Sequence, residues 1–361
     1  MEGKEGDKLK KLGFQDSYLE DLDSGYSHEF TIGRISKVLK NKYFLHEGKT
    51  EFPAELTGSL LFSSVTESDL PLVGDFVLFK KVDESLCIIE RVLKRKNFLQ
   101  RKSSGREISY QPIAANIDYA FIMQSLDNNF NPNRIERYLS IINDSNITPI
   151  ILLSKEDLIS QDQSKEILSE LKSLYPDYSI LSLSRAYPES IETLKEILVA
   201  TKTYIILGSS GVGKTSLLNS LDERHQFKTK ELSDSSQKGK HTTTNRYFTI
   251  LDNGAIFIDT PGMREISNFA YREGIGKTFQ NIVSFEKECK FNNCTHTTEP
   301  GCAVLKALSS GLIDSRQYDN FQKMLKEDEY LSSSYVDKRK KDKERGKLYR
   351  SILKNKPNKR S

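Results

Sequence analysis

The sequence predicts a multidomain fold with an N-terminal β-barrel, a central α/β domain and a C-terminal, mainly helical domain. Three observations lead to this prediction. The chain has 361 residues, more than one compact core usually holds. Short strand-like segments fill the N-terminal part, and apolar strands alternate with amphipathic helices in the middle. Three of the four cysteines lie close together ahead of the last helical segments.

The N-terminal part divides into a charged segment and a strand-rich domain. Residues 1–28 show no convincing apolar period, and we expect a flexible arm there. Within residues 29–97, turn residues separate five strand-like segments, which read FTIGRISKV, KYFLH, TEFPAEL, DFVLFKKV and LCIIERV. Five short strands in so few residues fit a small closed barrel, and the OB-fold is the first candidate. OB-folds often bind oligonucleotides, although many small barrels do not.

Residues 107–268 carry the alternating pattern of a parallel, doubly wound α/β sheet. The apolar strands YAFIMQS, TPIILL, YSILSLS and TYIILG are each followed by a helical segment. Residues 280–361 contain the helical segments AVLKALSSG and RQYDNFQKMLKE and then a tail rich in Lys and Arg.

A phosphate-binding loop follows the strand TYIIL. Residues 208–215 fit G-x-x-x-x-G-K-[ST], and a helix beginning TSLLNSL leaves the loop. In such a loop, backbone N–H groups bind the α- and β-phosphates, Lys214 reaches the β/γ oxygens and the Thr215 hydroxyl binds Mg²⁺. The predicted phosphate-binding residues are Gly208, Ser209, Ser210, Gly211, Val212, Gly213, Lys214, Thr215 and Ser216.

A second phosphate motif comes 45 residues after Lys214. The strand AIFID ends at Asp259 in Asp-Thr-Pro-Gly, where the carboxylate can bind Mg²⁺ through water and the Gly262 N–H can meet a γ-phosphate. Between the two motifs, the sequence GKHTTT (239–244) suits a loop that closes over the γ-phosphate, although it can also be merely polar. One of its three threonines should supply a second Mg²⁺ oxygen, and we favour Thr243.

A candidate guanine-binding motif follows the strand TPIILL. It consists of Ser154, Lys155, Glu156 and Asp157, which approximates N/T-K-x-D with Ser in the first position. The Asp157 carboxylate can accept from guanine N1–H and the 2-amino group, and the Lys155 stem can lie along the base. After the next strand, Ser184 and Arg185 begin a turn in which a main-chain N–H can meet guanine O6. The base motif precedes the phosphate motif by about 50 residues, so the sequence predicts a circularly permuted domain.

The residue after Asp-x-x-Gly is Met263, where many GTPases carry a Gln that orients the attacking water. Intrinsic hydrolysis should therefore be slow. The candidate for the missing group is His241 in the loop 239–244, although this residue can also be structural or contact RNA.

Four residues in C-x4-C-x-H-x5-C spacing predict a metal site: Cys289, Cys294, His296 and Cys302. Three thiolates and one imidazole complete a tetrahedral zinc site with no position for water, which indicates a structural role. The alternative is a scattering of reduced cysteines. Cys87, in LCIIERV, is interpreted as a small buried hydrophobe.

Charge is distributed unevenly along the chain. Residues 337–361 hold twelve Lys or Arg against three Asp or Glu, a net of +9, whereas the whole chain has a net charge of +4. This tail favours a polyanionic partner such as RNA, or is a solvated, frayed end. No apolar run reaches the length of a membrane helix and no secretory signal is evident, so we expect a cytoplasmic protein without membrane contact, and a monomer.

Together these motifs resemble the ribosome small subunit-dependent GTPase A family. The strings that carry the resemblance are IAANID (113–118), GSSGVGKTSLLN (208–219), GKHTTT (239–244), DTPG (259–262) and CKFNNCTHTTEPGCAV (289–304). The resemblance extends from about residue 30 to the end. It implies GTP hydrolysis stimulated by the small ribosomal subunit as a late assembly checkpoint, with contact to ribosomal RNA and release of another assembly factor. It also implies His241 as the catalytic group, and GTP or GDP, Mg²⁺ and one structural Zn²⁺ as bound groups.

Two other classes of function fit part of the pattern. A guanine-nucleotide sensor with little hydrolysis agrees with Met263. A P-loop ATPase or kinase requires the Ser154–Asp157 match to be accidental. Nucleotide competition and turnover with small subunits distinguish these alternatives.

Overall fold

The structure, a computed structural model, describes residues 4–20, 22, 30–39, 42–48, 50–83, 86–102, 110–221, 246–259 and 272–332. The chain forms two compact units. The first contains residues 1–101 and 110–267, and the second contains residues 102–109 and 268–361. No helix in the described ranges is both long and apolar enough to cross a lipid bilayer.

The N-terminal domain is the predicted five-stranded closed barrel. Its strands are β1 (Thr31–Leu39), β2 (Lys42–His46), β3 (Glu51–Leu56), β4 (Phe76–Lys81) and β5 (Cys87–Val92). Strand β1 pairs antiparallel with β2 and with β4, β3 pairs with β2 and β5, and β4 pairs with β5, so the sheet closes on itself. Every second residue points inward, and the barrel core includes Ile35, Leu45, Val77, Phe79, Cys87 and Ile89. The short helix α2 (Gly58–Ser63) follows β3. These pairings confirm the OB-type barrel.

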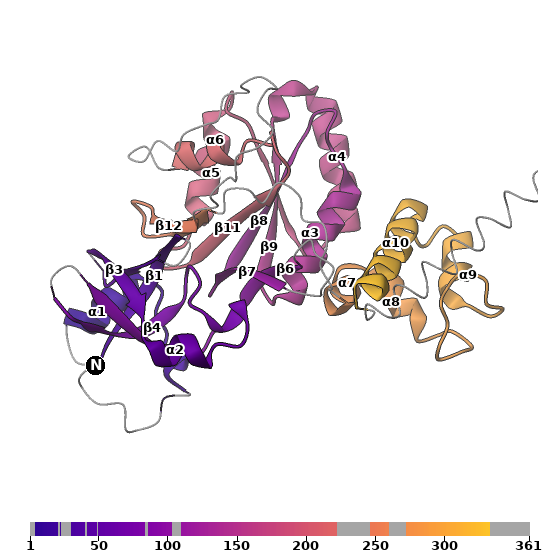
Figure 1. Cartoon of the computed structure of the whole chain (residues 1–361). Coiled ribbons are helices and arrows are strands. Elements are labelled where there is room, and N and C mark those ends of the chain that lie inside the picture. Colours follow the sequence, from indigo (N-terminus) through magenta and orange to yellow (C-terminus); the bar gives the residue numbers. More distant parts are fainter. Residues whose placement is uncertain are drawn as a thin grey trace, which may run out of the picture. The chain divides into compact units, whose positions relative to one another are not determined.

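Residues 4–20 differ from the expected flexible arm. They form helix α1 (Lys4–Lys11) and a short 3-10 helix η1 (Asp16–Leu19), seen in indigo in Figure 1. Leu12 is fully buried, and the rings of Phe14 and Tyr18 pack at 5.2 and 5.0 Å from the ring of Phe76. The prediction was wrong here because a few well-spaced apolar residues anchor a segment whose other residues are mostly charged.

The central domain contains the predicted parallel sheet. Its strands run in the order β10-β9-β8-β11-β13, all parallel: β8 (Tyr119–Ser125), β9 (Thr148–Ser154), β10 (Ser179–Leu183), β11 (Thr203–Gly208) and β13 (Ile256–Asp259). Helices α3 (Pro132–Asp144) and α4 (Gln161–Leu174) cover one face, and α5 (Pro188–Ile197) and α6 (Lys214–Leu221) cover the other (Figure 1). The α5 and α6 face buries Phe121, Leu152, Tyr204 and Phe257 with Leu194 and Leu217. The sheet is therefore doubly wound, as predicted.

Strand β12 (Arg246–Ile250) joins the two sheets and was not predicted. It pairs antiparallel with β13 on one side and with β1 of the barrel on the other. Barrel and α/β domain thus share one continuous eleven-stranded sheet and belong to one compact unit. A separate two-stranded sheet of β6 (Phe98–Lys102) and β7 (Tyr110–Ala115) was also missed.

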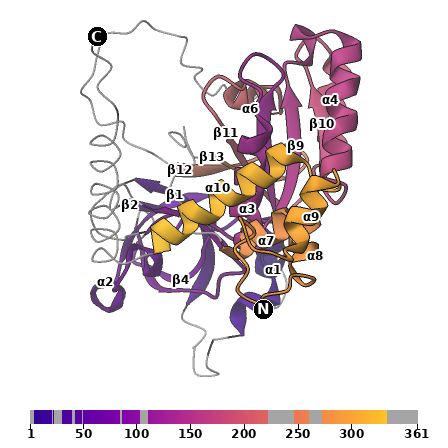
Figure 2. The same ribbon diagram turned by 90° about the vertical axis from the view of Figure 1, so that its right-hand side faces the viewer.

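The second unit is helical in its described part, as expected. It consists of α7 (Arg272–Thr278), α8 (Gln280–Glu286), α9 (Ala303–Ser309) and α10 (Ser315–Ser332), drawn in orange and yellow in Figure 2. Its core contains Ile275, Phe279, Ile282, Val304, Phe321 and Met324. The long loop between α8 and α9 carries the Cys/His cluster.

Candidate functional site

The phosphate-binding loop lies between the end of β11 and the start of α6. Gly208, Gly211 and Gly213 all adopt positive φ, at 158°, 81° and 99°. A Cβ on Gly208 would lie 2.5 Å from the carbonyl oxygen of Met123, so the backbone approaches β8 too closely for any side chain. These conformations are open to glycine at little steric cost, and they let a loop turn several N–H groups toward one anion.

Three side chains complete the loop. The Lys214 ammonium donates to the carbonyl oxygens of Gly208 and Ser209, each at 2.7 Å, so the cation lies across the loop. Val212 is buried in the core below the loop and fixes it to the sheet. Thr215 is half-buried in the first turn of α6, next to Lys214. This arrangement fits the phosphates and Mg²⁺ of a nucleotide, because it joins oriented N–H groups, a cation and a hydroxyl.

The predicted base motif meets this loop directly. Ser154, the last residue of β9, is buried and donates through its hydroxyl to the carbonyl oxygen of Val212 at 2.7 Å. The next residues leave the sheet: Lys155 adopts a left-handed conformation (φ 60°) and Asp157 is exposed. The structure thus brings together motifs that lie more than fifty residues apart in the chain.

The two predicted base segments are hydrogen-bonded to each other. The Ser184 hydroxyl donates to the Asp157 carboxylate and accepts the Ala186 N–H at 3.0 Å. Arg185 is exposed at the same turn. The Glu156 carboxylate instead accepts a hydrogen bond from the Ser164 hydroxyl of α4, which links the motif to that helix. Asp157 is left as the exposed acceptor of the group, which suits the N1–H and 2-amino donors of guanine.

A loop after β8 adds residues that sequence reasoning missed. Asp127 forms an ion pair with Lys155 at 2.9 Å. Burial would raise the pKa of Asp127, but hydrogen bonds from Lys155, the Asn129 N–H and the Ser125 hydroxyl lower it below its ordinary value. Arg134 at the start of α3 donates to the Ser209 hydroxyl at 3.2 Å. No local motif marks these residues, because each contact joins separate βα loops at the carboxyl edge of the sheet.

The structure describes part of the predicted magnesium end of the site. Asp259 is half-buried at the end of β13, and the Tyr247 hydroxyl of β12 donates to its Oδ2 at 3.1 Å. Burial and the neighbouring Asp259 charge raise the pKa of Tyr247 well above its usual range, which keeps the phenol protonated. The predicted residues Gly262, Met263, His241 and Thr243 lie outside the described residues.

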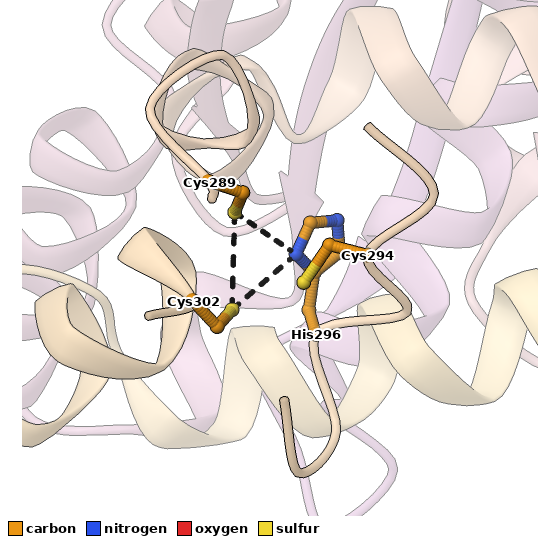
Figure 3. A group of neighbouring side chains, drawn as sticks. All are labelled: Cys289, Cys294, His296 and Cys302. Atoms are coloured by element: carbon orange, nitrogen blue, oxygen red, sulfur yellow. Dashed lines mark hydrogen bonds between the residues drawn. The ribbon is translucent and has the colours of Figure 1, made fainter. Parts of the chain in front are cut away.

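The four predicted metal ligands converge on one point in the second unit (Figure 3). Their ligand atoms all lie within 4.8 Å of one another. Cys289 Sγ and Cys302 Sγ are 3.9 Å apart, and His296 Nδ1 lies 3.6 and 3.5 Å from them. Sulfurs bound to one zinc at about 2.3 Å lie about 3.8 Å apart, and sulfur and nitrogen lie about 3.6 Å apart. Cys289, Cys302 and His296 therefore have the spacing of a tetrahedral zinc site, and Cys294 Sγ lies within 4.8 Å of their ligand atoms.

Outer contacts hold the cluster in place. The other ring nitrogen of His296 lies 3.2 Å from Glu286, which fixes Nδ1 as the nitrogen that faces the thiols. Burial would raise the pKa of Cys289, but the N–H groups of Ala303 and Val304 lower it, which favours the thiolate. The Tyr318 hydroxyl donates to the His296 carbonyl at 2.5 Å and ties the loop to α10. Neither Glu286 nor Tyr318 could be identified from the sequence.

Comparison with known proteins agrees with this geometry. The sequence profile described as RsgA GTPase matches residues 92–269. A protein named small ribosomal subunit biogenesis GTPase RsgA 1 from Listeria innocua is 39% identical over 325 residues, which cover 89% of this chain and 90% of the relative. A protein of the same name from Bacteroides thetaiotaomicron is 34% identical and covers 98% of this chain and 99% of the relative.

Two solved structures share the fold. The crystal structure of YjeQ from Thermotoga maritima aligns with a TM-score of 0.65 at 26% identity, over 84% of this chain and 100% of that chain. The crystal structure of YloQ, described as a circularly permuted GTPase, aligns with a TM-score of 0.61 at 24% identity, over 87% of this chain and 100% of that chain. The permuted order inferred from the motifs is therefore confirmed as a property of the fold.

Proposed function

Because this chain belongs to the RsgA GTPase family, we propose that it binds the small ribosomal subunit and hydrolyses GTP as a late checkpoint in that subunit's assembly. GTP hydrolysis itself follows from membership in a family of GTPases. Stimulation by the subunit, contact with its RNA and release of another assembly factor are parts of the proposal.

One observation carries the proposal. A cradle whose geometry suits a guanine nucleotide, assembled from motifs in permuted order, lies in a chain whose relatives over most of its length are named small ribosomal subunit biogenesis GTPases. The contact from Ser154 to Val212 joins the base motif to the phosphate loop. A P-loop ATPase would have no need for an exposed Asp157 held by Ser184 beside that loop.

Each part of the cradle has a distinct task in this proposal. Asp157 accepts from the guanine edge, and Lys155, held by Asp127, lies along the base. The loop 208–215 and Lys214 hold the phosphates. Thr215, Asp259 and Thr243 would bind Mg²⁺, which neutralises charge on the β- and γ-phosphates, and Gly262 would donate to the γ-phosphate.

Hydrolysis requires a group that orients the attacking water. Met263 can neither donate nor accept a hydrogen bond usefully. We assign this task to His241, brought into place when the chain meets the ribosomal subunit, so that the free protein turns over slowly.

The second unit carries the proposed RNA contact. One structural Zn²⁺ at Cys289, Cys294, His296 and Cys302 would fix the loop between α8 and α9. Residues 337–361, with a net charge of +9, would bind ribosomal RNA phosphates. The segment after Asp259 leads directly into this unit, which would couple nucleotide state to RNA contact. We place the protein in the cytoplasm, as a monomer.

A guanine-nucleotide sensor with little hydrolysis is the second candidate, and Met263 is the observation that favours it. Steady-state GTP turnover with and without purified small subunits tests both. A GTPase of the proposed kind shows a large increase with subunits, whereas a sensor shows little.

A further inference from the structure

The side chain of Tyr247 holds the carboxylate at the magnesium end of the site. Tyr247 of β12 and Asp259 of β13 are direct cross-strand partners in an antiparallel pair. Direct partners project to the same face of a sheet, so the contact at 3.1 Å between the phenol oxygen and Oδ2 is built into the strand register. It does not depend on a loop.

The hydrogen bond restricts how Asp259 presents its oxygens. The phenol donates and the carboxylate accepts, so Oδ2 is held toward β12 and rotation of the carboxylate is limited. Outer hydrogen bonds of this kind orient a carboxylate for a metal, and their loss weakens metal binding by about 10- to 100-fold where the carboxylate is a direct ligand. Asp259 would bind Mg²⁺ through water, so we expect a loss no larger than the lower end of that range.

The barrel fixes Tyr247 from the other side. On β1, Lys37 is the cross-strand partner of Tyr247. Phe248, the next residue on β12, packs against the buried Arg34. The guanidinium carbon of Arg34 lies over the Phe248 ring, 5.6 Å from the centre of that ring. Arg34 also donates to Thr203 of β11 at 2.8 Å. The strand that carries Tyr247 is therefore held between barrel and α/β sheet, and Tyr247 cannot shift unless the edge of the barrel also moves.

We infer that Tyr247 is a positioning residue that orients Asp259 for Mg²⁺ and links that carboxylate to the barrel strand β1. The inference rests on the proposed function, in which Asp259 binds Mg²⁺ through water. It predicts that loss of the phenol hydroxyl weakens Mg²⁺-dependent retention of nucleotide without weakening nucleotide binding in the absence of Mg²⁺.

The test is Tyr247→Phe in the full-length chain, which keeps the ring and removes one oxygen. The dissociation rate of a fluorescent GDP analogue is measured across Mg²⁺ concentrations and in excess chelator. We expect the Mg²⁺ concentration for half-maximal slowing to rise several-fold, up to about tenfold, with an unchanged rate in chelator.

Tyr204→Phe is the matched control. Tyr204 is a buried tyrosine of the same sheet, and its hydroxyl accepts the Val199 N–H at 2.9 Å. This change should leave the Mg²⁺ midpoint at the wild-type value. A wild-type midpoint in folded Tyr247→Phe, or an equal shift in both variants, overturns the inference. Release from the wild-type protein that is independent of Mg²⁺ would instead overturn the proposed magnesium site.

Discussion

The Ser154 hydroxyl lies 2.7 Å from the carbonyl oxygen of Val212. Ser154 ends β9 directly before the proposed base-binding residues, and Val212 lies inside the proposed phosphate loop. One short hydrogen bond thus joins the two halves of the nucleotide site in a chain whose order is permuted. Many GTPases carry Asn or Thr where this chain has Ser154, and the short Ser side chain still reaches the loop.

Ser154→Ala should weaken GDP and GTP binding about fivefold. The variant loses the buried hydrogen bond from the Ser154 hydroxyl to the Val212 carbonyl, which links the two motifs and contributes about 1 kcal/mol. Equilibrium titration with a fluorescent nucleotide measures this change. Ser182→Ala in the adjacent strand β10 is the control, because the buried Ser182 hydroxyl has no hydrogen-bond partner in the described part of the chain. Equal affinities in the two variants would show that the Val212 contact does not organise the site.

Asp157→Asn should remove the preference for guanine. An amide in place of the carboxylate presents a donor to N1–H or the 2-amino group, so affinity for GTP should fall at least about tenfold. Competition of ATP and GTP against a labelled guanine nucleotide measures the preference. Glu156→Gln is the control, since Glu156 accepts from Ser164 and faces α4. Strong competition by ATP in the wild-type protein would contradict a guanine site.

His241→Ala should lower the subunit-stimulated kcat with little change in nucleotide affinity. The physical reason is that a water-orienting group acts in the transition state and adds little to ground-state binding. Single-turnover hydrolysis with saturating small subunits measures it. Unchanged stimulated turnover in this variant would exclude His241 as the missing group.

Cys302→Ser should release the metal and unfold the loop between α8 and α9. Elemental analysis is expected to show one zinc per wild-type chain and a large loss in the variant, because a hydroxyl replaces a thiolate. Nucleotide binding by the first unit should persist. Cys87→Ser is the control, since Cys87 is buried in the barrel core of the first unit and is not a member of the cluster. Full zinc content in Cys302→Ser would contradict the ligand assignment.

Arg34→Met should destabilise the first unit by several kcal/mol. The buried guanidinium donates to the carbonyls of Leu12, Gly74 and Asn116. An apolar side chain leaves the carbonyls of Leu12 and Asn116 without this donor, at about 1–3 kcal/mol each, whereas the Gly74 carbonyl still accepts from the Asn116 amide. Urea unfolding monitored by intrinsic tyrosine fluorescence measures the loss. Lys37→Met on the same strand is the control, because Lys37 is only half-buried. Equal stability of the two variants would contradict the role of Arg34 in holding the N-terminal segment to the barrel.

Local patterns predicted most of the fold. The five barrel strands and the five parallel strands of the central sheet appear where alternation and apolar runs indicated them, because burial of one or both faces shapes the sequence directly. Strand β12 was missed because RYFTI is short and follows a polar segment, and its place is set by pairing with β1 and β13. The sequence pattern that indicates helices α7 to α10 is weaker, because much of that segment is polar.

The parts of the candidate site that consist of residues at a fixed spacing in the sequence could be predicted from that spacing. The phosphate loop, the base motif and the Cys/His cluster all depend on residues close in sequence, and the structure brings the described members of each together. Asp127, Arg134, Tyr247 and Glu286 were not predictable, because each supports a site residue that lies in another segment of the chain. No spacing rule encodes such contacts.

The most direct test of the proposed function is steady-state GTP turnover by the full-length chain, alone and with purified small or large ribosomal subunits. We predict slow turnover alone, a many-fold increase with small subunits that saturates at equimolar subunit, and no increase with large subunits. Equal turnover with and without small subunits would contradict the proposal that this protein is a GTPase switch acting on the small subunit.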